Sequence, residues 1–524
     1  MRASRLIAGL VVIAMVAVVV FAVVQSLQQD GGSTKNSTPS SAPTLAPTPT
    51  PEPGSSEPPE AALATFYAQT LDWQICPSGE DECATLTVPL DYKHPDGETI
   101  DLAVLKVPAE DQDARIGSMV VDPGGPGAPA TSYASDGSWG EALKEHFDIV
   151  GMDPRGVGES DPVDCLSDQD LDNYFAGDPD PDSPDEVAAY QAAVEMFGSG
   201  CEAESGDLAA HVSTIEAARD MDVLRSALGE TKLTYFGASY GTKLGATYAE
   251  FFPGRVGRLV LDGAVDPTLK LVESTTTQAE GFETALRSYV QDCLDGGDCF
   301  LGDSLDAGLA RISSLLDQLD QEPMSTQLGD RELTEGLAFY GIAVALYSRD
   351  SWTYLDQGLK MAFDGDGSVL TLLSDAYAER NKDGTYASNS LEAFPTISCL
   401  DDPSFVPFDK VHDYIPALEQ ASPTFGRAFA WGLTMCAGFT ARSTEKPRPL
   451  HAKGAPPIVV VGTTRDPATP FEEAVALADQ LDSGVLVSRD GDGHTGYSSG
   501  NDCVDEAVEG YLVDGTVPQD GLEC

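Results

Sequence analysis

The sequence has few basic residues. Its 524 residues include 30 Lys and Arg against 85 Asp and Glu, a formal net charge of −55 with His neutral. A surface with this excess of negative charge repels nucleic acid and anionic lipid head groups. We therefore expect no nucleic-acid partner, and we interpret most of the acidity as an adaptation to solubility or salt. A second interpretation is that some of the acids attract a cationic ligand, such as the free α-amino group of a peptide.

The signatures of several cofactors are also missing. The chain has no HExxH motif, no cluster of His ligands and no phosphate-binding loop. We therefore expect neither a metal nor a nucleotide cofactor. No CxxC pair is present either, which argues against zinc or thioredoxin-like chemistry. No internal repeat is visible.

Cysteine is present in an even number, ten residues. Disulfides form in oxidising compartments, whereas the alternative is a set of buried free thiols. Sequence alone does not fix the pairing, but the positions suggest neighbours. These are Cys76 with Cys83, Cys165 with Cys201, Cys293 with Cys299, Cys399 with Cys436, and Cys503 with Cys524.

The N-terminus has the features of an export signal. Arg2 and Arg5 precede a run without charge at residues 6–24, long enough to span the hydrocarbon core of a bilayer, with its positive flank inside. The end of the run is a poor cleavage site. We therefore predict an uncleaved anchor at residues 1–30, with secretion after cleavage as the alternative. Residues 31–60 hold eight Pro and eleven Ser or Thr, which predicts an extended spacer.

From residue 61 onward, short apolar runs alternate with amphipathic stretches. This alternation predicts an α/β fold, with a mostly parallel sheet covered by helices on both faces. The expected strands are 102–107, 118–121, 147–152, 233–236, 256–261, 458–461 and 485–488, and the expected helices include 214–228 and 240–252.

Between about residues 267 and 450 the pattern changes, and apolar residues keep helical spacing in the stretches 282–293, 305–319 and 352–363. We interpret this segment as a helical insertion that caps a ligand site, and the alternative is a purely structural subdomain. The sheet domain is then built from residues 61–266 and 451–524.

The segment Gly237-Ala238-Ser239-Tyr240-Gly241 fits the pattern G-x-S-x-G between a predicted strand and a predicted helix. A sharp turn of this kind lifts the Ser hydroxyl free of the sheet, so Ser239 is the candidate nucleophile. The backbone N–H of Tyr240 lies at a helix N-terminus and can donate to a developing oxyanion. The second donor is expected from the loop Gly124–Gly127, and we choose the N–H of Gly125. The alternative for that loop is a tight turn with no role.

The base is expected to be a His near the C-terminal end. In this type of fold the triad follows the chain order Ser, acid, His, which selects His494 among the six His residues. The acid follows the preceding strand, so Asp466 is the candidate that orients the imidazole. Asp490 and Asp492 are the competing acids. The turn at residues 153–160 shapes neighbouring loops, and we assign it no direct chemistry.

Four segments together resemble the prolyl-aminopeptidase branch of the α/β hydrolases. They are Asp122–Gly127, Asp153–Ser160, Gly237–Gly241 and Leu261–Pro267. Secreted actinobacterial tripeptidyl aminopeptidases are closer still, since their C-terminal region resembles residues 430–524. The resemblance covers roughly residues 65–524 and is weakest in the insertion. Prolyl aminopeptidases usually have His-Gly where this chain has Asp122-Pro123, a departure that favours the tripeptidyl branch.

The resemblance implies the α/β-hydrolase fold, no cofactor, and a serine exopeptidase that removes short peptides, tripeptides in the closer branch, from free N-termini. It also implies an acid under the cap that binds the substrate ammonium. The candidates for this acid are Glu273, Glu280, Asp401 and Asp402. The alternatives are an esterase or lipase with the same triad, an endopeptidase, and a surface binding protein without activity. We expect a monomer outside the cytoplasm that touches the membrane only through its anchor.

Overall fold

The computed structural model describes residues 45–47, 50–79, 81–441 and 447–524. It divides into two compact units: residues 175–178 and 289–386 form the smaller one, and the other described residues form the larger one. The predicted insertion at 267–450 is shared by both units, so its role as a cap stays a prediction. No helix within the described ranges has the length and apolar character to cross a bilayer. The anchor predicted at residues 1–30 lies outside those ranges.

Ten strands form one sheet in the larger unit, and two more form a hairpin in the smaller unit. Their bounds are β1 Gln74–Ile75, β2 Glu82–Pro89, β3 Thr99–Val107, β4 Gly117–Asp122, β5 Phe147–Met152, β6 Leu233–Ala238, β7 Val256–Asp262, β8 Met324–Ser325, β9 Glu332–Leu333, β10 Ile458–Arg465, β11 Gly484–Asp492 and β12 Leu522–Glu523.

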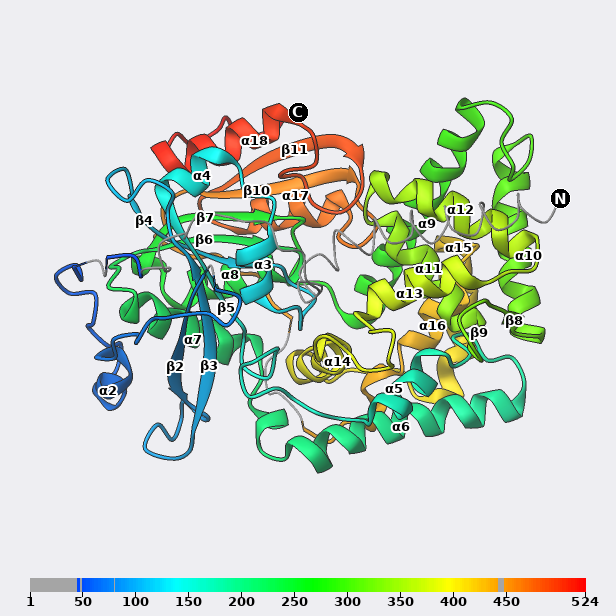
Figure 1. The fold of residues 1–524 in the computed structure, drawn as a ribbon, viewed down its shortest axis with the longest axis horizontal. Helices are drawn as coiled ribbons and strands as arrows, with labels where there is room; N and C mark the ends of the chain where they lie inside the picture. Colours follow the sequence, from blue (N-terminus) through cyan, green and yellow to red (C-terminus); the bar gives the residue numbers. More distant parts are fainter. Residues whose placement is uncertain (1–44, 48–49, 80, 442–446) are drawn as a thin grey trace, which may run out of the picture. The chain divides into compact units, whose positions relative to one another are not determined.

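The large sheet has the order β1-β2-β3-β5-β4-β6-β7-β10-β11-β12. From β5 to β12 all neighbours are parallel, while β1, β2 and β3 pair antiparallel and β3 is antiparallel to β5. Segments from both ends of the chain therefore meet in one sheet (Figure 1). This order and direction is the α/β-hydrolase fold, as the sequence predicts. The seven predicted strands are all present, and β12 follows the one we expected to be last.

Helices and short helical turns connect the strands. The helices are α2 Ala64–Tyr67, α3 Ala130–Asp136, α4 Glu141–His146, α5 Asp168–Phe175, α6 Pro184–Ser205, α7 Thr214–Ala227, α8 Tyr240–Phe251, α9 Leu271–Asp295, α10 Leu305–Gln321, α11 Glu335–Leu346, α12 Trp352–Phe363, α13 Ser368–Ala378, α14 Ser390–Asp401, α15 Ile415–Ala421, α16 Gly426–Gly432, α17 Phe471–Gln480 and α18 Asp502–Glu509. The turns are η1 Ala61–Leu63, η2 Leu208–Ala210, η3 Pro253–Arg255, η4 Arg349–Ser351, η5 Phe408–Asp413, η6 Met435–Gly438 and η7 Gly510–Asp514.

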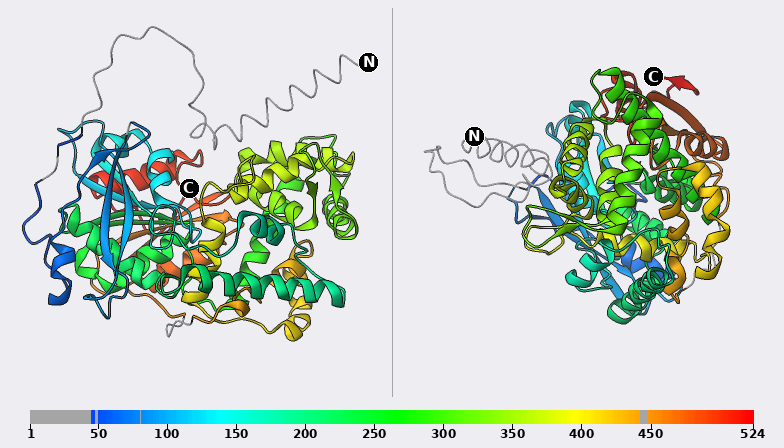
Figure 2. Two further views of the ribbon diagram at one scale, coloured as in Figure 1. Left: turned by 60° about the horizontal axis from the view of Figure 1, so that its bottom comes forward. Right: turned by 90° about the vertical axis from the view of Figure 1, so that its right-hand side faces the viewer.

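The strands are buried on both faces, which explains their continuous apolar runs. Successive side chains point to opposite faces. Val120 and Val460 face a core shared with α7, α8 and α17. Their neighbours Val121 and Val461 face a second core shared with α3, α4 and α18. Helices on both faces of the sheet are visible in the views of Figure 2.

The larger unit also contains helices that do not cover the sheet. Ala279 of α9 packs with α15 and α16 around the fully buried Trp431. In the smaller unit, the α9 residue Tyr289 donates a hydrogen bond to Asp356 of α12 at 2.8 Å. The helices predicted within 267–450 are therefore present, although some pack in the larger unit and others in the smaller unit.

The ten cysteines form five disulfides, with no free thiol. Each bond joins the neighbours that the sequence suggests: Cys76–Cys83, Cys165–Cys201, Cys293–Cys299, Cys399–Cys436 and Cys503–Cys524. Such a set of bonds fits a protein that matures in an oxidising, extracytoplasmic compartment.

Part of the predicted spacer differs from the expectation. The Glu52 N–H donates to Gly229 O at 2.8 Å, and the Thr231 N–H donates to the Glu52 carboxylate at 2.7 Å. Ser55 is buried. The segment just before residue 61 is therefore attached to the sheet domain, because its backbone and carboxylate groups satisfy polar groups at the edge of that domain. A protein prepared for experiments should keep these residues.

The turn at residues 153–160 contains a fully buried guanidinium. Arg155 makes two hydrogen bonds to Asp220, at 2.7 and 2.8 Å, and donates to the carbonyl oxygens of Leu90 and His211, both at 2.8 Å, and of Pro89 at 3.1 Å. Arg155 thus ties the turn to the β2–β3 hairpin and to α7. This agrees with a shaping role for the turn.

We expect Arg155→Leu to destabilise the larger unit by about 3–5 kcal/mol, because the change leaves the buried Asp220 charge without its partner. Urea unfolding followed by tryptophan fluorescence measures the effect. Arg448→Leu is the matched control, since Arg448 and its partner Glu250 are partly exposed and such a pair contributes about 1 kcal/mol or less. Equal effects of the two changes would contradict the assignment.

Candidate active site

Ser239 lies at the turn between β6 and α8. Its backbone has φ 55° and ψ −124°, a strained conformation for a residue with a side chain. The Ser239 N–H donates to Asp262 O at 2.8 Å, at the end of the neighbouring strand β7. A Cβ at Gly237 would lie 2.4 Å from Gly241 O. Glycine is therefore required for the strand and helix to pass this closely, and the turn has the geometry of a nucleophile elbow.

The loop after β4 lies directly against this elbow. Gly124 has φ +96°, and a Cβ there would be 2.7 Å from the Tyr240 nitrogen and 2.9 Å from the Ser239 Cβ. Gly125 follows with φ +105°. The structure thus brings together the two segments that hold the predicted oxyanion donors, the N–H groups of Gly125 and Tyr240. A side chain at Gly124 would force the segments apart.

His494 and Asp466 are hydrogen bonded to each other. The His494 Nδ1 lies 2.8 Å from Asp466 Oδ1 and 2.9 Å from Asp466 Oδ2. The Asp466 carboxylate also accepts N–H bonds from Ala468 and Thr469, both at 2.9 Å, and from Thr495 at 3.0 Å. These bonds fix the carboxylate and leave Nε2 as the imidazole nitrogen that can act as a base.

The environment of His494 favours the protonated imidazole. Burial alone lowers the pKa of His494, but attraction to Asp466, the Asp466 hydrogen bond and the charge of Asp262 outweigh it, so the pKa is raised above its ordinary value. A pair in which a carboxylate stabilises the imidazolium is the arrangement that general base catalysis requires.

Asp262 is a further residue of the candidate site, and sequence reasoning gave it no role. It ends β7, and its carboxylate accepts the N–H groups of Gly496 at 2.7 Å and Tyr497 at 2.8 Å. Its carbonyl holds Ser239, as described above. Burial raises the pKa of Asp262 to about 6, although the two N–H bonds and His494 counteract it. Asp262 therefore joins the Ser239 turn to the His494 loop. The sequence signal that could have identified Asp262 is its position as an acid directly after the predicted strand 256–261.

The competing acids are occupied elsewhere. Arg465 binds Asp490 at 2.8 Å and Asp492 at 2.7 Å. The hydrogen bond from Arg465 lowers the pKa of Asp490. Of the three acids weighed from the sequence, the structure places Asp466 on His494.

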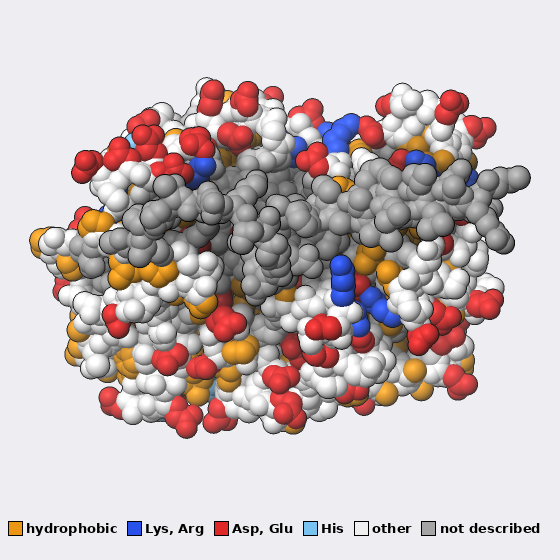
Figure 3. Space-filling model, in the orientation of Figure 1, with side chains coloured by type: hydrophobic (Ala, Val, Ile, Leu, Met, Phe, Trp, Pro, Cys, Tyr) orange, Lys and Arg blue, Asp and Glu red, His pale blue; other side chains and the backbone are white. Residues whose placement is uncertain are grey.

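The four candidate acids for an ammonium group differ in their surroundings. Asp401 pairs with Lys243 at 2.6 Å and accepts the Thr214 N–H at 2.9 Å, so its charge is already neutralised. Asp402 accepts the Ser404 N–H at 3.1 Å. Glu273 and Glu280 are exposed on α9. Many acidic side chains are spread over the face of the molecule drawn in Figure 3.

Helix α9 contacts the loop that carries Asp466. The Gln278 side chain donates to Ala468 O at 3.1 Å, and a Cβ at Gly281 would lie 2.6 Å from Pro467 O. Helix α14 contacts the other loop, since a Cβ at Gly127 would lie 2.9 Å from the Cβ of Ala393. These two helices flank the candidate site.

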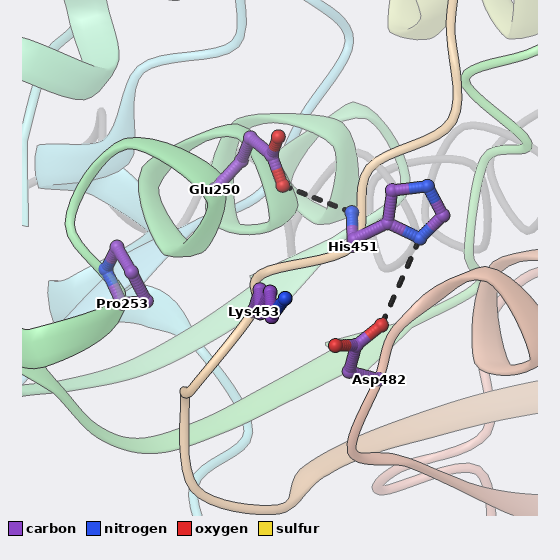
Figure 4. A pocket seen from close by; sticks show the side chains of 5 residues that line it. All are labelled: Glu250, Pro253, His451, Lys453 and Asp482. Carbon is purple, nitrogen blue, oxygen red and sulfur yellow. Dashed lines mark hydrogen bonds and ion pairs between the residues drawn. The ribbon is translucent and has the colours of Figure 1, made fainter.

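A cavity at the other end of the sheet is unrelated to this geometry. It is lined by Glu250, Pro253, His451, Lys453 and Asp482 (Figure 4). The last of these precedes β11, whereas His494 follows β11. In the cavity, the backbone N–H of His451 donates to the Glu250 carboxylate at 2.9 Å, and the ring Nδ1 of His451 lies 3.8 Å from Asp482. Both acids of the cavity are therefore already in contact with His451.

Among the described residues that belong to the larger unit alone, one group of side chains has the spacing of metal ligands. Asp91, His211 and Glu216 bring ligand atoms within 4.8 Å of one another. However, Asp91 is hydrogen bonded to His94 at 2.7 Å, and Glu216 accepts the Ser213 hydroxyl at 2.8 Å. Local hydrogen bonds therefore account for this cluster without an ion.

Comparison with known proteins gives relatives along most of the chain. The serine protease Hip1 of Mycobacterium tuberculosis is 38% identical over 479 residues, which are 87% of this chain and 91% of the relative. Carboxylesterase B of the same organism is 38% identical over 84% of this chain and 86% of its own. The tripeptidyl aminopeptidase of Streptomyces coelicolor is 29% identical over 87% of this chain and 86% of its own.

The family model of the TAP-like proteins, a branch of the α/β hydrolases, matches residues 422–524. This segment contains β10, β11, Asp466 and His494. The sheet order, the elbow at Ser239 and the relatives along most of the chain agree with one another. The chain therefore belongs to the TAP-like family of α/β-hydrolase serine hydrolases, as its motifs predict.

Proposed function

We propose that this protein is an extracytoplasmic serine exopeptidase that releases short peptides, tripeptides in particular, from free N-termini. The observation that carries the proposal is the hydrogen bond between His494 and Asp466. Asp262 connects the loop that contains His494 to the turn that contains Ser239, because it accepts N–H groups from both. The relatives named serine protease and tripeptidyl aminopeptidase support a peptide substrate.

The proposed reaction begins with attack of the Ser239 Oγ on the scissile carbonyl carbon. His494 Nε2 takes the hydroxyl proton, and Asp466 stabilises the imidazolium. The carbonyl oxygen becomes an oxyanion that accepts the N–H groups of Gly125 and Tyr240. The C–N bond then breaks as His494 returns the proton to the leaving amine. Water, deprotonated by His494, hydrolyses the acyl-enzyme and frees the Ser239 hydroxyl.

Selection of a free N-terminus requires a negative charge at a fixed distance from Ser239. Asp401 is unsuited, because it already binds Lys243. Glu273 and Glu280 are the better candidates, since they are exposed on α9, the helix that contacts the Asp466 loop. An ammonium group bound there would determine how many residues lie between the N-terminus and the scissile bond.

The location and assembly are part of the same proposal. Five disulfides support an extracytoplasmic location. The charge-free run at residues 6–24 supports a membrane anchor. We propose that the folded part acts as a monomer.

Ester hydrolysis is a second candidate, favoured by the relative named Carboxylesterase B. Both reactions use the same acyl-enzyme chemistry, so the triad does not separate them. The walls of the site decide which substrate enters.

Three substrates separate these functions. The full-length protein should hydrolyse a tripeptidyl coumarin with a free amine at least about tenfold faster than its N-acetyl form, because each 1.4 kcal/mol of ammonium binding contributes a factor of ten. A short-chain nitrophenyl ester is the third substrate. Preference for the ester would favour an esterase, and equal cleavage of both peptides would favour an endopeptidase.

The variants Glu280→Gln and Glu273→Gln then identify the ammonium site, through the same comparison of the free and acetylated peptides. Glu322→Gln is the control for each, because Glu322 is exposed elsewhere on the molecule.

A further inference from the structure

Asp122 is a buried acid directly beneath the nucleophile elbow. It is the last residue of β4, only 4% exposed, and it pairs in register with Gly237 of β6. A Cβ added at Gly241, in the first turn of α8, would lie 2.9 Å from Asp122 Oδ1. The carboxyl group therefore lies against the turn that presents Ser239. The mechanism above gives it no role.

The same carboxyl group holds the loop that we assign to the oxyanion. The Gly124 N–H donates to Asp122 Oδ1 at 2.9 Å. Gly124 in turn contacts Ser239 and Tyr240, and it precedes Gly125. This hydrogen bond, donated by Gly124 and accepted by Asp122, fixes the position of Gly124 and, through it, the direction of the Gly125 N–H.

The surroundings of Asp122 disfavour a negative charge. Among the described residues, no Lys, Arg or His side chain pairs with it. The groups around it include Asp153 after β5, Tyr133 of α3, Tyr235 of β6 and Tyr240 of α8. It also lines a small cavity with apolar side chains such as Met221 and Leu244. An isolated carboxylate in such a place is costly, so the neutral acid is favoured.

The pKa of Asp122 agrees with this picture. Burial raises it to about 7, the Gly124 N–H counteracts part of the rise, and repulsion by Asp153 adds to it. The acid therefore changes its charge within the pH range in which a His-dependent hydrolase works.

We propose that Asp122 is a positioning residue of the oxyanion hole, and that it acts as the neutral acid. Its carbonyl oxygen accepts the Gly124 N–H and so aims the neighbouring Gly125 N–H at the substrate oxygen. A neutral group does this without placing a second negative charge beside the developing oxyanion. The inference rests on the proposed function of Ser239 and of the Gly125 N–H.

The consequence is a fall in activity at alkaline pH that does not come from His494. Ionisation of Asp122 opposes the oxyanion, so the rate of Ser239 acylation should decline as the pH rises through the pKa of this acid. Loss of the His494 proton has the opposite effect, because the neutral imidazole is the active base. The two groups together predict a bell-shaped profile.

The test measures the rate at which a fluorophosphonate labels Ser239 in the full-length protein between pH 5 and pH 10. This probe needs the nucleophile and the oxyanion donors but no particular peptide. The variants are Asp122→Asn, which keeps an oxygen acceptor for Gly124 and does not ionise, and Asp122→Ala, which has no acceptor. Asp148→Asn is the matched control, because Asp148 is also a buried strand acid but lies near the opposite end of its strand.

We expect Asp122→Asn to label within about threefold of the unmodified protein at pH 6 and to keep its rate at pH 9, where the unmodified protein slows. Asp122→Ala should label about 10- to 100-fold more slowly at every pH. Removal of one oxyanion donor lowers the rate by about 10²- to 10³-fold, and displacement of a donor should have a smaller effect of the same kind. Asp148→Asn should keep the unmodified profile.

Two results would overturn the inference. One is an Asp122→Asn profile that superimposes on that of the unmodified protein. The other is an Asp122→Ala variant, folded by circular dichroism, that labels at the unmodified rate. Neither result affects the proposed function. Failure of the unmodified protein to react at Ser239 would instead remove the proposed function, and the inference with it.

Discussion

Replacing Ser239 by Ala should lower kcat for any substrate of this protein by about 10⁵- to 10⁶-fold, since loss of a triad nucleophile has an effect of this size in serine proteases. The physical reason is that no other group in the site can form the acyl-enzyme. Binding should change little, because the Ala variant keeps the oxyanion donors and the walls of the site. Hydrolysis of the tripeptidyl coumarin and of the nitrophenyl ester measures the loss.

The control for this prediction is Ser199→Ala, an exposed serine on α6. It should retain the unmodified rate. Thermal unfolding should give the same midpoint for all three proteins within a few degrees. Ser239→Ala with more than about a hundredth of the unmodified activity would mean that a different residue is the nucleophile.

Replacing Asp466 by Asn should lower kcat by about 10⁴-fold, the loss seen when the triad acid becomes an amide. The Asp466 carboxylate holds His494 in the tautomer that leaves Nε2 free, and an amide can hold the wrong one. The hydrogen bonds from Ala468 and Thr469 can remain with Asn, so the fold should persist. Asp490→Asn is the control, and it should stay within about threefold of the unmodified rate because Asp490 binds Arg465.

The same variant should change the pH profile. Activity requires neutral His494, and its pKa is raised by Asp466 against the lowering effect of burial. In the unmodified protein, activity should therefore rise with pH through a value above that of an ordinary His. In Asp466→Asn the remaining effect of burial lowers the pKa, so the acid limb should move to lower pH. If the acid limb of the Asp466→Asn profile lies at the same pH as in the unmodified protein, another acid sets the pKa of His494.

The central strands were predictable from the sequence because a parallel sheet buries both of its faces. Runs such as 147–152 and 458–461 contain no exposed side chain, which makes them stand out without any partner. Strand β2 was missed because it lies toward the edge of the sheet and mixes buried with exposed residues. Helix α14 was missed because it contains Pro395, a residue that normally interrupts a helix.

Some residues of the candidate site were also predictable from the sequence, and others were not. Ser239, Asp466 and His494 follow from local motifs and from the order of the triad in the chain, so local sequence sufficed to nominate them. The roles of Asp262 and Asp122 depend on which strands are neighbours. Asp262 accepts N–H groups from residues 496 and 497, and Asp122 lies against Gly237 and Gly241 of the elbow. The pairing of Asp401 with Lys243 also appears only in the folded chain, and it removes an acid that the sequence made a candidate for the substrate amine.

Identification of the residue that a fluorophosphonate modifies tests directly whether Ser239 is the nucleophile. The full-length protein is labelled in its native state, digested with trypsin and analysed by mass spectrometry, with a heat-denatured sample as the control. We expect a label on the native protein alone, within the tryptic peptide Leu233–Lys243 and on Ser239. A native protein that stays unlabelled, or that is labelled on another peptide, would contradict the claim that Ser239 is an activated nucleophile.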